Sequence, residues 1–253
     1  MRQLQIRHFM LFGILKEHFL FLTRSQIERI LTLPTNSTNK GLLWLVSEKY
    51  LERRYRADTF THFQTPLYYL GMRGWRMAGN TPEGFKRYQG EIEQRSDQHL
   101  DHLLSVYDVL LKFILESEVT RIIGGEDSFW QESLSFGNIP DAWIQYKGSE
   151  AFIEVDRETE SPEVVAKKIE NYARFKRSGS YRILFPGCGF KVLFITTTEE
   201  RIEALERITT SDDIWYATMD EFLKEPLDHQ HWFALKGFYA LSFTPKKEVQ
   251  ELP

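Results

Sequence analysis

The fold is decided by residues 139–156, which read IPDAWIQYKGSEAFIEVD. Two stretches rich in apolar, aromatic and β-branched residues flank a short turn at residues 147–149, a pattern that predicts a β-hairpin. Ser161 and Pro162 follow, and they suit the N-cap and first position of a helix that runs to about Arg177. A pair of strands leading into a helix is therefore the organising unit of the C-terminal half.

Three carboxylates are distributed over this predicted hairpin. Because side chains alternate along a strand, Glu154 and Asp156 lie on one face of the second strand. Asp141 begins the first strand, so the hairpin brings it beside them where the register allows. Oxygen ligands at this spacing suit Mg²⁺ or Mn²⁺, which would orient a water and stabilise charge developing on a phosphodiester. The alternative is an amphipathic edge strand whose polar face is only hydrated.

The rest of the C-terminal half predicts further strands and helices. Expected helices cover about residues 92–116 and 199–208, and expected strands cover residues 119–123, 191–196 and 214–219. Residues 231–243 are apolar and aromatic but receive no assignment, and no role is assigned to residues 225–253. The order of elements predicts a mixed sheet with helices on it.

The N-terminal residues predict three helices, a hairpin and a short closing helix. The helices are expected at residues 6–20, from a cap at Thr23, and at 37–49; the strands at 51–56 and 67–70; the closing helix at 72–78. This is the order of a winged helix-turn-helix, in which the third helix enters the major groove and the wing contacts phosphate or the minor groove. Many such folds instead serve as protein-interaction modules.

Residue types on the third helix and the hairpin suit contact with double-stranded DNA. Side chains at the start of the helix can reach phosphate or base edges, and arginines on the hairpin can neutralise backbone charge. The predicted DNA-binding residues are Asn36, Ser37, Asn39, Lys40, Arg53, Arg54 and Arg56.

The net charge of −4 is unevenly distributed along the chain. Residues 1–90 carry 14 Lys and Arg against 6 Asp and Glu, a net charge of +8, whereas residues 91–253 carry 18 against 30, a net charge of −12. Such asymmetry favours an anion-binding module joined to an acidic one. We therefore expect a DNA-binding domain at 1–79, a turn-rich linker at 80–91 and a second domain at 92–253.

Several other classes of protein are excluded by the sequence. A single cysteine, Cys188, rules out an internal disulfide framework and a cysteine-cluster zinc site, and it favours a reducing cytoplasmic setting. No uninterrupted apolar stretch approaches membrane-spanning length, so no membrane association is expected. The nucleophile and phosphate-loop motifs of other enzyme classes are absent.

The motifs resemble those of two known groups of proteins. Pro140-Asp141 followed by Glu154-Val155-Asp156 is similar to the PD-(D/E)XK nuclease pattern, with Asp156 where that superfamily usually has lysine. Together with the winged helix, with FIEVDRETE at 152–160 and with KIENY at 168–172, the chain over about residues 5–220 resembles the replication-relaxation family of plasmids and other mobile elements.

The resemblance implies an α+β fold with an N-terminal winged helix-turn-helix and a restriction-endonuclease-like domain that has a mixed sheet. It implies a DNA-binding protein acting in replication, mobilisation or transcriptional control. Expected partners are double-stranded DNA, a second copy of the chain in a homodimer, and replication or mobilisation proteins.

A lysine on the following helix could replace the one that Asp156 displaces. At about 100° per residue, Val165, Ile169 and Tyr172 define the buried face, and Lys168 lies roughly 60° from its centre. Lys168 could thus reach the carboxylates, or it could simply cover apolar surface; Lys147 in the turn is a weaker substitute. The alternative to a DNA-binding protein of doubtful nuclease activity is therefore a metal-dependent endonuclease that uses Asp141, Glu154, Asp156 and Lys168. A protein-interaction adaptor is a third possibility.

Overall fold

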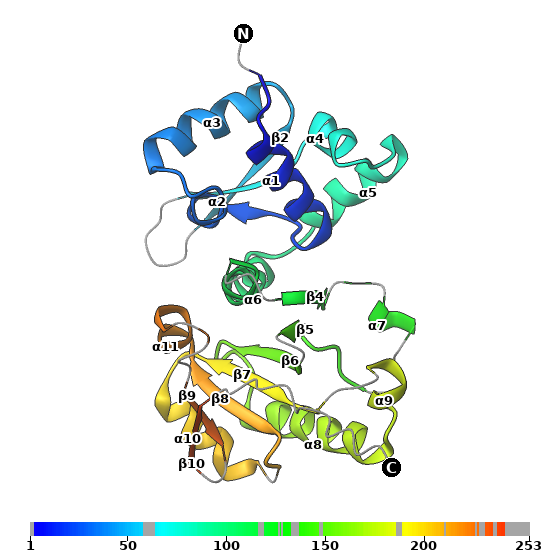
Figure 1. Cartoon of the computed structure of the whole chain (residues 1–253), viewed down its shortest axis with the longest axis vertical. Coiled ribbons are helices and arrows are strands. Elements are labelled where there is room, and N and C mark those ends of the chain that lie inside the picture. Colours follow the sequence, from blue (N-terminus) through cyan, green and yellow to red (C-terminus); the bar gives the residue numbers. More distant parts are fainter. Residues whose placement is uncertain are drawn as a thin grey trace, which may run out of the picture. The chain divides into compact units, whose positions relative to one another are not determined.

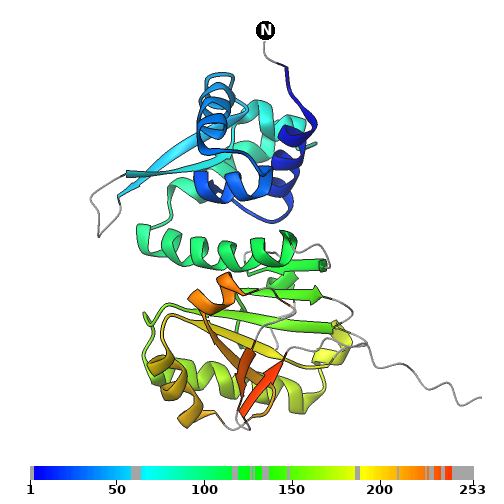
Figure 2. The ribbon, with the colours of Figure 1, turned by 60° about the vertical axis from the view of Figure 1, so that its left-hand side comes forward.

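The computed structural model divides the chain between Leu111 and Lys112 into two units, here the N-unit and the C-unit. The structure describes residues 3–57, 64–115, 119–125, 127, 129–132, 137–146, 149–185, 189–209, 211–225, 227, 231–234 and 237–240. Figure 1 labels the elements, and Figure 2 shows the same ribbon after a 60° turn. In the described part of the chain, no helix is both long and apolar enough to cross a membrane.

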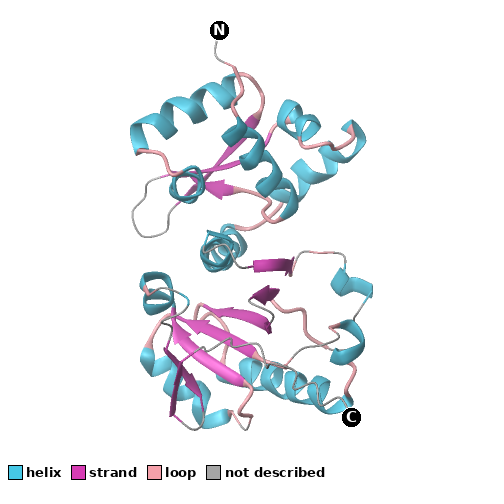
Figure 3. Cartoon of the chain, viewed as in Figure 1, coloured by secondary structure: helices cyan, strands magenta, loops and turns pink. Residues whose placement is uncertain are grey.

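The N-unit combines helices with a small antiparallel sheet (Figure 3). Its elements are α1 (Ile6–Glu17), β1 (Leu22–Thr23), α2 (Arg24–Leu31), α3 (Thr35–Ser47), β2 (Leu51–Ala57), β3 (Gln64–Leu70), α4 (Met72–Met77), α5 (Pro82–Glu93) and most of α6 (Asp97–Leu115). The strands are ordered β1-β3-β2. The helices and strands expected before residue 79 are therefore present, with ends shifted by a few residues; the turn between β2 and β3 lies outside the described residues.

Local sequence explains where α2 begins. The Thr23 hydroxyl accepts the backbone N–H of Gln26 at 3.3 Å, and the Gln26 side chain accepts the N–H of Thr23 at 2.9 Å. This reciprocal pair satisfies two backbone donors that a helix start otherwise leaves open. The helix then stops at Thr32, which adopts the left-handed conformation with φ of 51°.

The expected linker at residues 80–91 is instead helix α5, which packs into the N-unit. Pro82 occupies the start of the helix, so the turn signals there are a helix N-terminus rather than a flexible connection. Tyr88 is buried, its ring stacks on Trp75 at 4.7 Å, and its hydroxyl donates to the Leu20 carbonyl at 2.8 Å. The helix expected at residues 92–116 is α6, which begins at Asp97. The boundary between the two units follows Leu111, about twenty residues beyond the end of the expected linker.

The C-unit is built on a mixed sheet ordered β10-β9-β8-β7-β6-β5-β4. Its strands are β4 (Val119–Gly124), β5 (Ala142–Tyr146), β6 (Ser149–Asp156), β7 (Val192–Thr196), β8 (Ile214–Thr218), β9 (His231–Ala234) and β10 (Gly237–Ala240). Strands β6, β7 and β8 pair in parallel and the other neighbours pair antiparallel. The predicted α+β class and mixed sheet are confirmed, and β9 and β10 occupy the segment that received no assignment.

Helices complete the C-unit and bury its core. They are α7 (Phe129–Glu132), α8 (Pro162–Ser178), α9 (Tyr181–Leu184), α10 (Glu199–Ile208) and α11 (Met219–Lys224). Val165, Ile169 and Tyr172 of α8 join a buried cluster with Phe152 of β6, whose ring lies 5.6 Å from that of Tyr172. The face of β6 that carries Phe152 therefore faces α8, and the same alternation sends Glu154 and Asp156 to that side.

Candidate functional site

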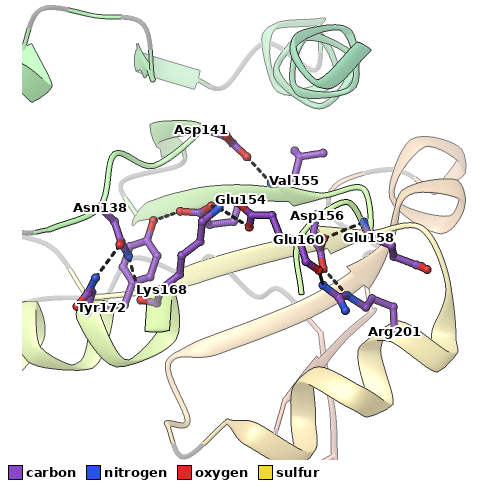
Figure 4. Close-up of polar contacts among 11 residues, drawn as sticks. Asn138, Asp141, Glu154, Val155, Asp156, Glu158, Glu160, Lys168, Tyr172 and Arg201 are labelled. Carbon is purple, nitrogen blue, oxygen red and sulfur yellow. Dashed lines mark hydrogen bonds and ion pairs between the residues drawn. The ribbon is translucent and has the colours of Figure 1, made fainter. Parts of the chain in front are cut away.

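A buried carboxylate on β6 meets two donors from α8. The Glu154 side chain is 2% exposed. Its Oε1 accepts the hydroxyl hydrogen of Tyr172, and its Oε2 lies 3.5 Å from Lys168 Nζ. Lys168 also pairs with Glu160 at 2.8 Å, as Figure 4 shows. Helix geometry predicted that Lys168 could reach these carboxylates, and that contact is present; its catalytic role stays a prediction.

The preceding segment fixes Asp141 at the start of β5. Asp141 Oδ2 accepts the backbone N–H of Val155 at 2.7 Å, which ties the segment to β6 (Figure 4). Upstream, the Asn138 amide donates to the Lys168 carbonyl at 3.0 Å and accepts from Asn171 at 2.8 Å. These hydrogen bonds connect the chain before Asp141 to α8, so the Pro-Asp segment is held against the helix that carries Lys168.

Burial and charge together set the ionisation of this cluster. Burial raises the pKa of Glu154 to about 7, and the negative charge of Asp141 adds to the rise. Lys168 and the Tyr172 hydroxyl oppose it only in part. For Lys168, burial lowers the pKa, but Glu154, Glu160 and Asp141 outweigh burial and hold it above its ordinary value. The cluster therefore pairs a lysine that stays charged with a carboxyl that titrates near neutral pH.

Asp156 is engaged elsewhere, in a buried ion pair with Arg201 of α10. The Arg201 Nε lies 2.6 Å from Asp156 Oδ2, and Asp156 Oδ1 accepts the N–H of Glu158 at 2.9 Å. The side chains of Asp156 and Arg201 are only 4% and 10% exposed. Arg201 also donates to the Glu160 carbonyl at 2.9 Å, so the pair joins β6, α10 and the chain leading to α8 (Figure 4). Asp156 was predicted to act with Asp141 and Glu154, but in the structure one of its oxygens pairs with Arg201 and the other accepts the backbone N–H of Glu158.

The three predicted carboxylates do not fit Mg²⁺ or Mn²⁺ as they are arranged. A hard divalent cation needs oxygen lone pairs turned toward it. Both oxygens of Glu154 instead face donors, Tyr172 and Lys168, and both oxygens of Asp156 are engaged. Among the described residues, no group of three His, Cys, Asp or Glu side chains could hold a metal ion. Asp141 lies close enough to Glu154 for its charge to raise the pKa of Glu154, whereas Asp156 pairs with Arg201.

The predicted DNA-binding residues fall into two classes in the N-unit. Asn36, Ser37 and Lys40 are exposed on α3, and Asn39 is half-buried. Arg53 is exposed on β2, with its guanidinium 5.1 Å from the centre of the Tyr55 ring.

Arg54 differs from these residues, because it points into the N-unit. It donates to the carbonyls of Ile92 and Arg95, the latter at 2.9 Å, and pairs with Asp97 at 3.6 Å. The Arg54 guanidinium therefore joins β2 to the connection between α5 and α6, and its predicted contact with DNA stays a prediction. The side chain of Arg56, and Lys147 and Cys188, lie outside the described residues.

A family model described as replication-relaxation matches residues 12–186, more than half of the chain. The chain belongs to the replication-relaxation family. The match takes in both α3 and the cluster around Glu154 and Lys168. No curated protein and no solved structure matches the chain.

Two contributors to the site of this replication-relaxation protein were missed from sequence. Arg201 follows β7, whose Thr196 is paired in register with Asp156. Parallel pairing of the two strands would have placed the first turn of α10 beside Asp156, but that pairing was not foreseen. Tyr172 was assigned to the buried face of α8, and its hydroxyl was not considered as the partner that a buried glutamate requires.

Proposed function

We propose that this replication-relaxation protein binds double-stranded DNA as part of a plasmid or other mobile element, acting in replication, mobilisation or transcriptional control. The N-unit would act as a winged helix-turn-helix, with α3 in the major groove and β2–β3 as the wing. The observation that carries the proposal is the division of α3. Thr38, Leu42 and Leu45 are buried, while Asn36, Ser37 and Lys40 are exposed along its first turns.

The C-unit would supply a docking or dimerisation surface rather than catalysis. In the nuclease superfamily that the Pro-Asp and Glu-x-Asp pattern resembles, a lysine is usual where Asp156 stands here. Asp156 instead forms a buried ion pair with Arg201, an interaction suited to holding the fold. The mixed sheet and its helices would then be kept as a scaffold.

The rival function is a metal-dependent DNA endonuclease. The observation that favours it is the approach of Lys168 Nζ to Glu154, 3.5 Å apart, with Asp141 close enough to raise the pKa of Glu154. The rival requires Glu154 to exchange the Tyr172 and Lys168 donors for a cation. Its test is therefore a metal titration of the whole chain.

The leading proposal is tested by the salt dependence of DNA binding in the Arg53→Ala variant. Each phosphate neutralised contributes about 0.9 to the slope of log affinity against log salt, so loss of one wing contact should flatten the slope by about that amount. Arg87→Ala is the matched control, because Arg87 is an exposed arginine of the N-unit that pairs with Glu91 on its own helix. Arg54→Ala would be a poor test, since Arg54 anchors the connection between α5 and α6.

Two outcomes would contradict this proposal. Absence of DNA binding by the wild-type chain at low salt would favour the protein-interaction adaptor. Equal slopes for the wild type, Arg53→Ala and Arg87→Ala would remove β2 from the DNA surface.

A further inference from the structure

A pocket of about 420 Å³ opens on the N-unit where the start of α1 meets the first turns of α3. Residues that line it include Gln5, Arg7, His8, Ser37, Lys40 and Trp44. Ser37, Lys40 and Trp44 are spaced three and four residues apart, so they form one side of α3. The pocket is thus a feature of two helices, and Ser37 and Lys40 also belong to the exposed surface proposed to contact DNA.

The charge of the pocket is that of an anion site. Arg7 from α1 and Lys40 from α3 both line it, and none of its described lining residues carries a carboxylate. Arg7 is exposed and forms no ion pair with any residue that the structure describes. Ser37 adds a hydroxyl and Gln5 an amide, the neutral donors that commonly accompany cations around a phosphate.

The surrounding helix ends reinforce that preference. Neither α1 nor α3 has an acidic residue in its first turn, and Pro34 at the N-cap of α3 has no side chain that could accept a hydrogen bond. The partial positive charge at the start of α3 therefore has no capping or acidic side chain beside it, whereas the start of α1 is capped reciprocally by Gln5 and His8. A phosphate near the start of α3 would be stabilised by that helix end and by both cations.

One wall of the pocket is formed by the aromatic rings of His8 and Trp44. The rings of His8 and Trp44 lie 5.8 Å apart, and Trp44 lies 5.9 Å from Tyr50. His8 Nδ1 accepts the backbone N–H of Gln5 at 2.9 Å, so in the neutral ring the hydrogen resides on Nε2. These aromatic contacts fix the side of the pocket against which the cations act.

We propose that this pocket is a phosphate-binding subsite, with Arg7 and Lys40 sharing one phosphate of the double-stranded DNA that α3 contacts. The inference deepens the proposed function and rests on it. Continuity with the exposed surface of α3, through Ser37 and Lys40, favours a backbone phosphate over a small phosphorylated ligand. Arg7, which is absent from the predicted DNA-binding set, thereby becomes a DNA contact.

The test measures the salt slope of duplex binding for the full chain and three variants, Arg7→Gln, Lys40→Gln and the double variant. If both cations hold one phosphate, the double variant loses about 0.9 of slope, no more than one phosphate accounts for. Additive losses approaching two phosphates would overturn the shared site, and a slope equal to that of the wild type would overturn the pocket as a phosphate site. Arg87→Gln is the control, and thermal unfolding verifies that the exposed substitutions leave the fold intact.

A second arm separates failure of the pocket from failure of the proposed function. Thymidine monophosphate and inorganic phosphate are titrated calorimetrically into the wild type and the double variant. If the wild type binds no DNA, the proposed function fails; nucleotide binding that the double variant loses would then assign the pocket to a small phosphorylated ligand and overturn its assignment to DNA. If the wild type binds DNA with a steep salt dependence and the double variant shows the same slope, the pocket is not a phosphate site, while the proposed DNA binding stands.

Discussion

Glu154 is a buried carboxyl whose ionisation works against folding. Its pKa rises from 4.5 in the unfolded reference to about 7 in the folded chain. Below pH 4.5 both states hold the proton. Between pH 4.5 and about 7 the unfolded chain releases this proton while the folded chain still holds it, so the free energy of unfolding falls across this range. Above pH 7 both states have released the proton, and the loss of stability remains constant.

Replacing Glu154 by the neutral glutamine should therefore stabilise the protein more at pH 8 than at pH 5. A shift of this size corresponds to about 3 kcal/mol at most, at 1.36 kcal/mol per pKa unit. Urea unfolding of Glu154→Gln and wild type at both pH values measures the difference. Glu170→Gln, which changes an exposed carboxylate on α8, is the control. A difference that does not depend on pH would contradict the assignment.

Asp156 gives a second prediction at the scale of single residues. Breaking a buried ion pair leaves one charge uncompensated, so Asp156→Ala and Arg201→Met should each destabilise the chain by about 3–5 kcal/mol. The double variant should recover much of that loss, because neither charge is then left alone. Denaturant unfolding in EDTA makes the readout independent of metal. Additive losses in the double variant would show that the two side chains do not act as a pair.

At the scale of elements, α4 packs so closely on the turn between α3 and β2 that it requires a glycine. A Cβ on Gly74 would lie 2.0 Å from the Tyr50 carbonyl oxygen, a backbone atom that cannot move aside cheaply. Gly74→Ala should therefore destabilise the N-unit by about 1–3 kcal/mol or more. Gly13→Ala in α1, where a Cβ meets nothing within 4 Å, should stabilise it by about 0.5–1 kcal/mol. Thermal unfolding should show opposite shifts, and shifts of the same sign would refute the close approach.

Elements were more predictable from the sequence than the contacts between them. Periodicity located α1, α3, α8 and the β5–β6 hairpin, because a repeating apolar face records what each element buries. The signals at residues 80–84 misled, since a proline in a turn and a proline at a helix start look alike in sequence. Strand alternation sends Arg53 and Arg54 to opposite faces of β2, but the local sequence does not reveal which partners Arg54 meets, because the carbonyls of Ile92 and Arg95 lie about forty residues further along the chain.

At the scale of the whole molecule, the charge pattern changes when it is counted by structural unit. Residues 1–111 carry a net charge of +4 and residues 112–253 a net charge of −8, because the acidic residues of α5 and α6 belong to the N-unit. The contrast is smaller than the +8 and −12 found by dividing the chain at residue 90. The proposed DNA binding would then depend on local basic surfaces rather than on the overall charge of a domain.

Metal binding and DNA cleavage, measured on the whole chain, distinguish the scaffold from the endonuclease. If Glu154 keeps its Tyr172 and Lys168 donors, 10 mM Mg²⁺ or Mn²⁺ should leave the unfolding temperature unchanged and supercoiled DNA intact. A real site with a dissociation constant of about 0.1 mM would instead stabilise the folded chain by about 2.7 kcal/mol under those conditions. Lys168→Ala provides the discriminating comparison. Metal-dependent nicking by the wild type that this variant loses, with DNA affinity retained, would establish the endonuclease, because only a catalytic lysine separates cleavage from binding.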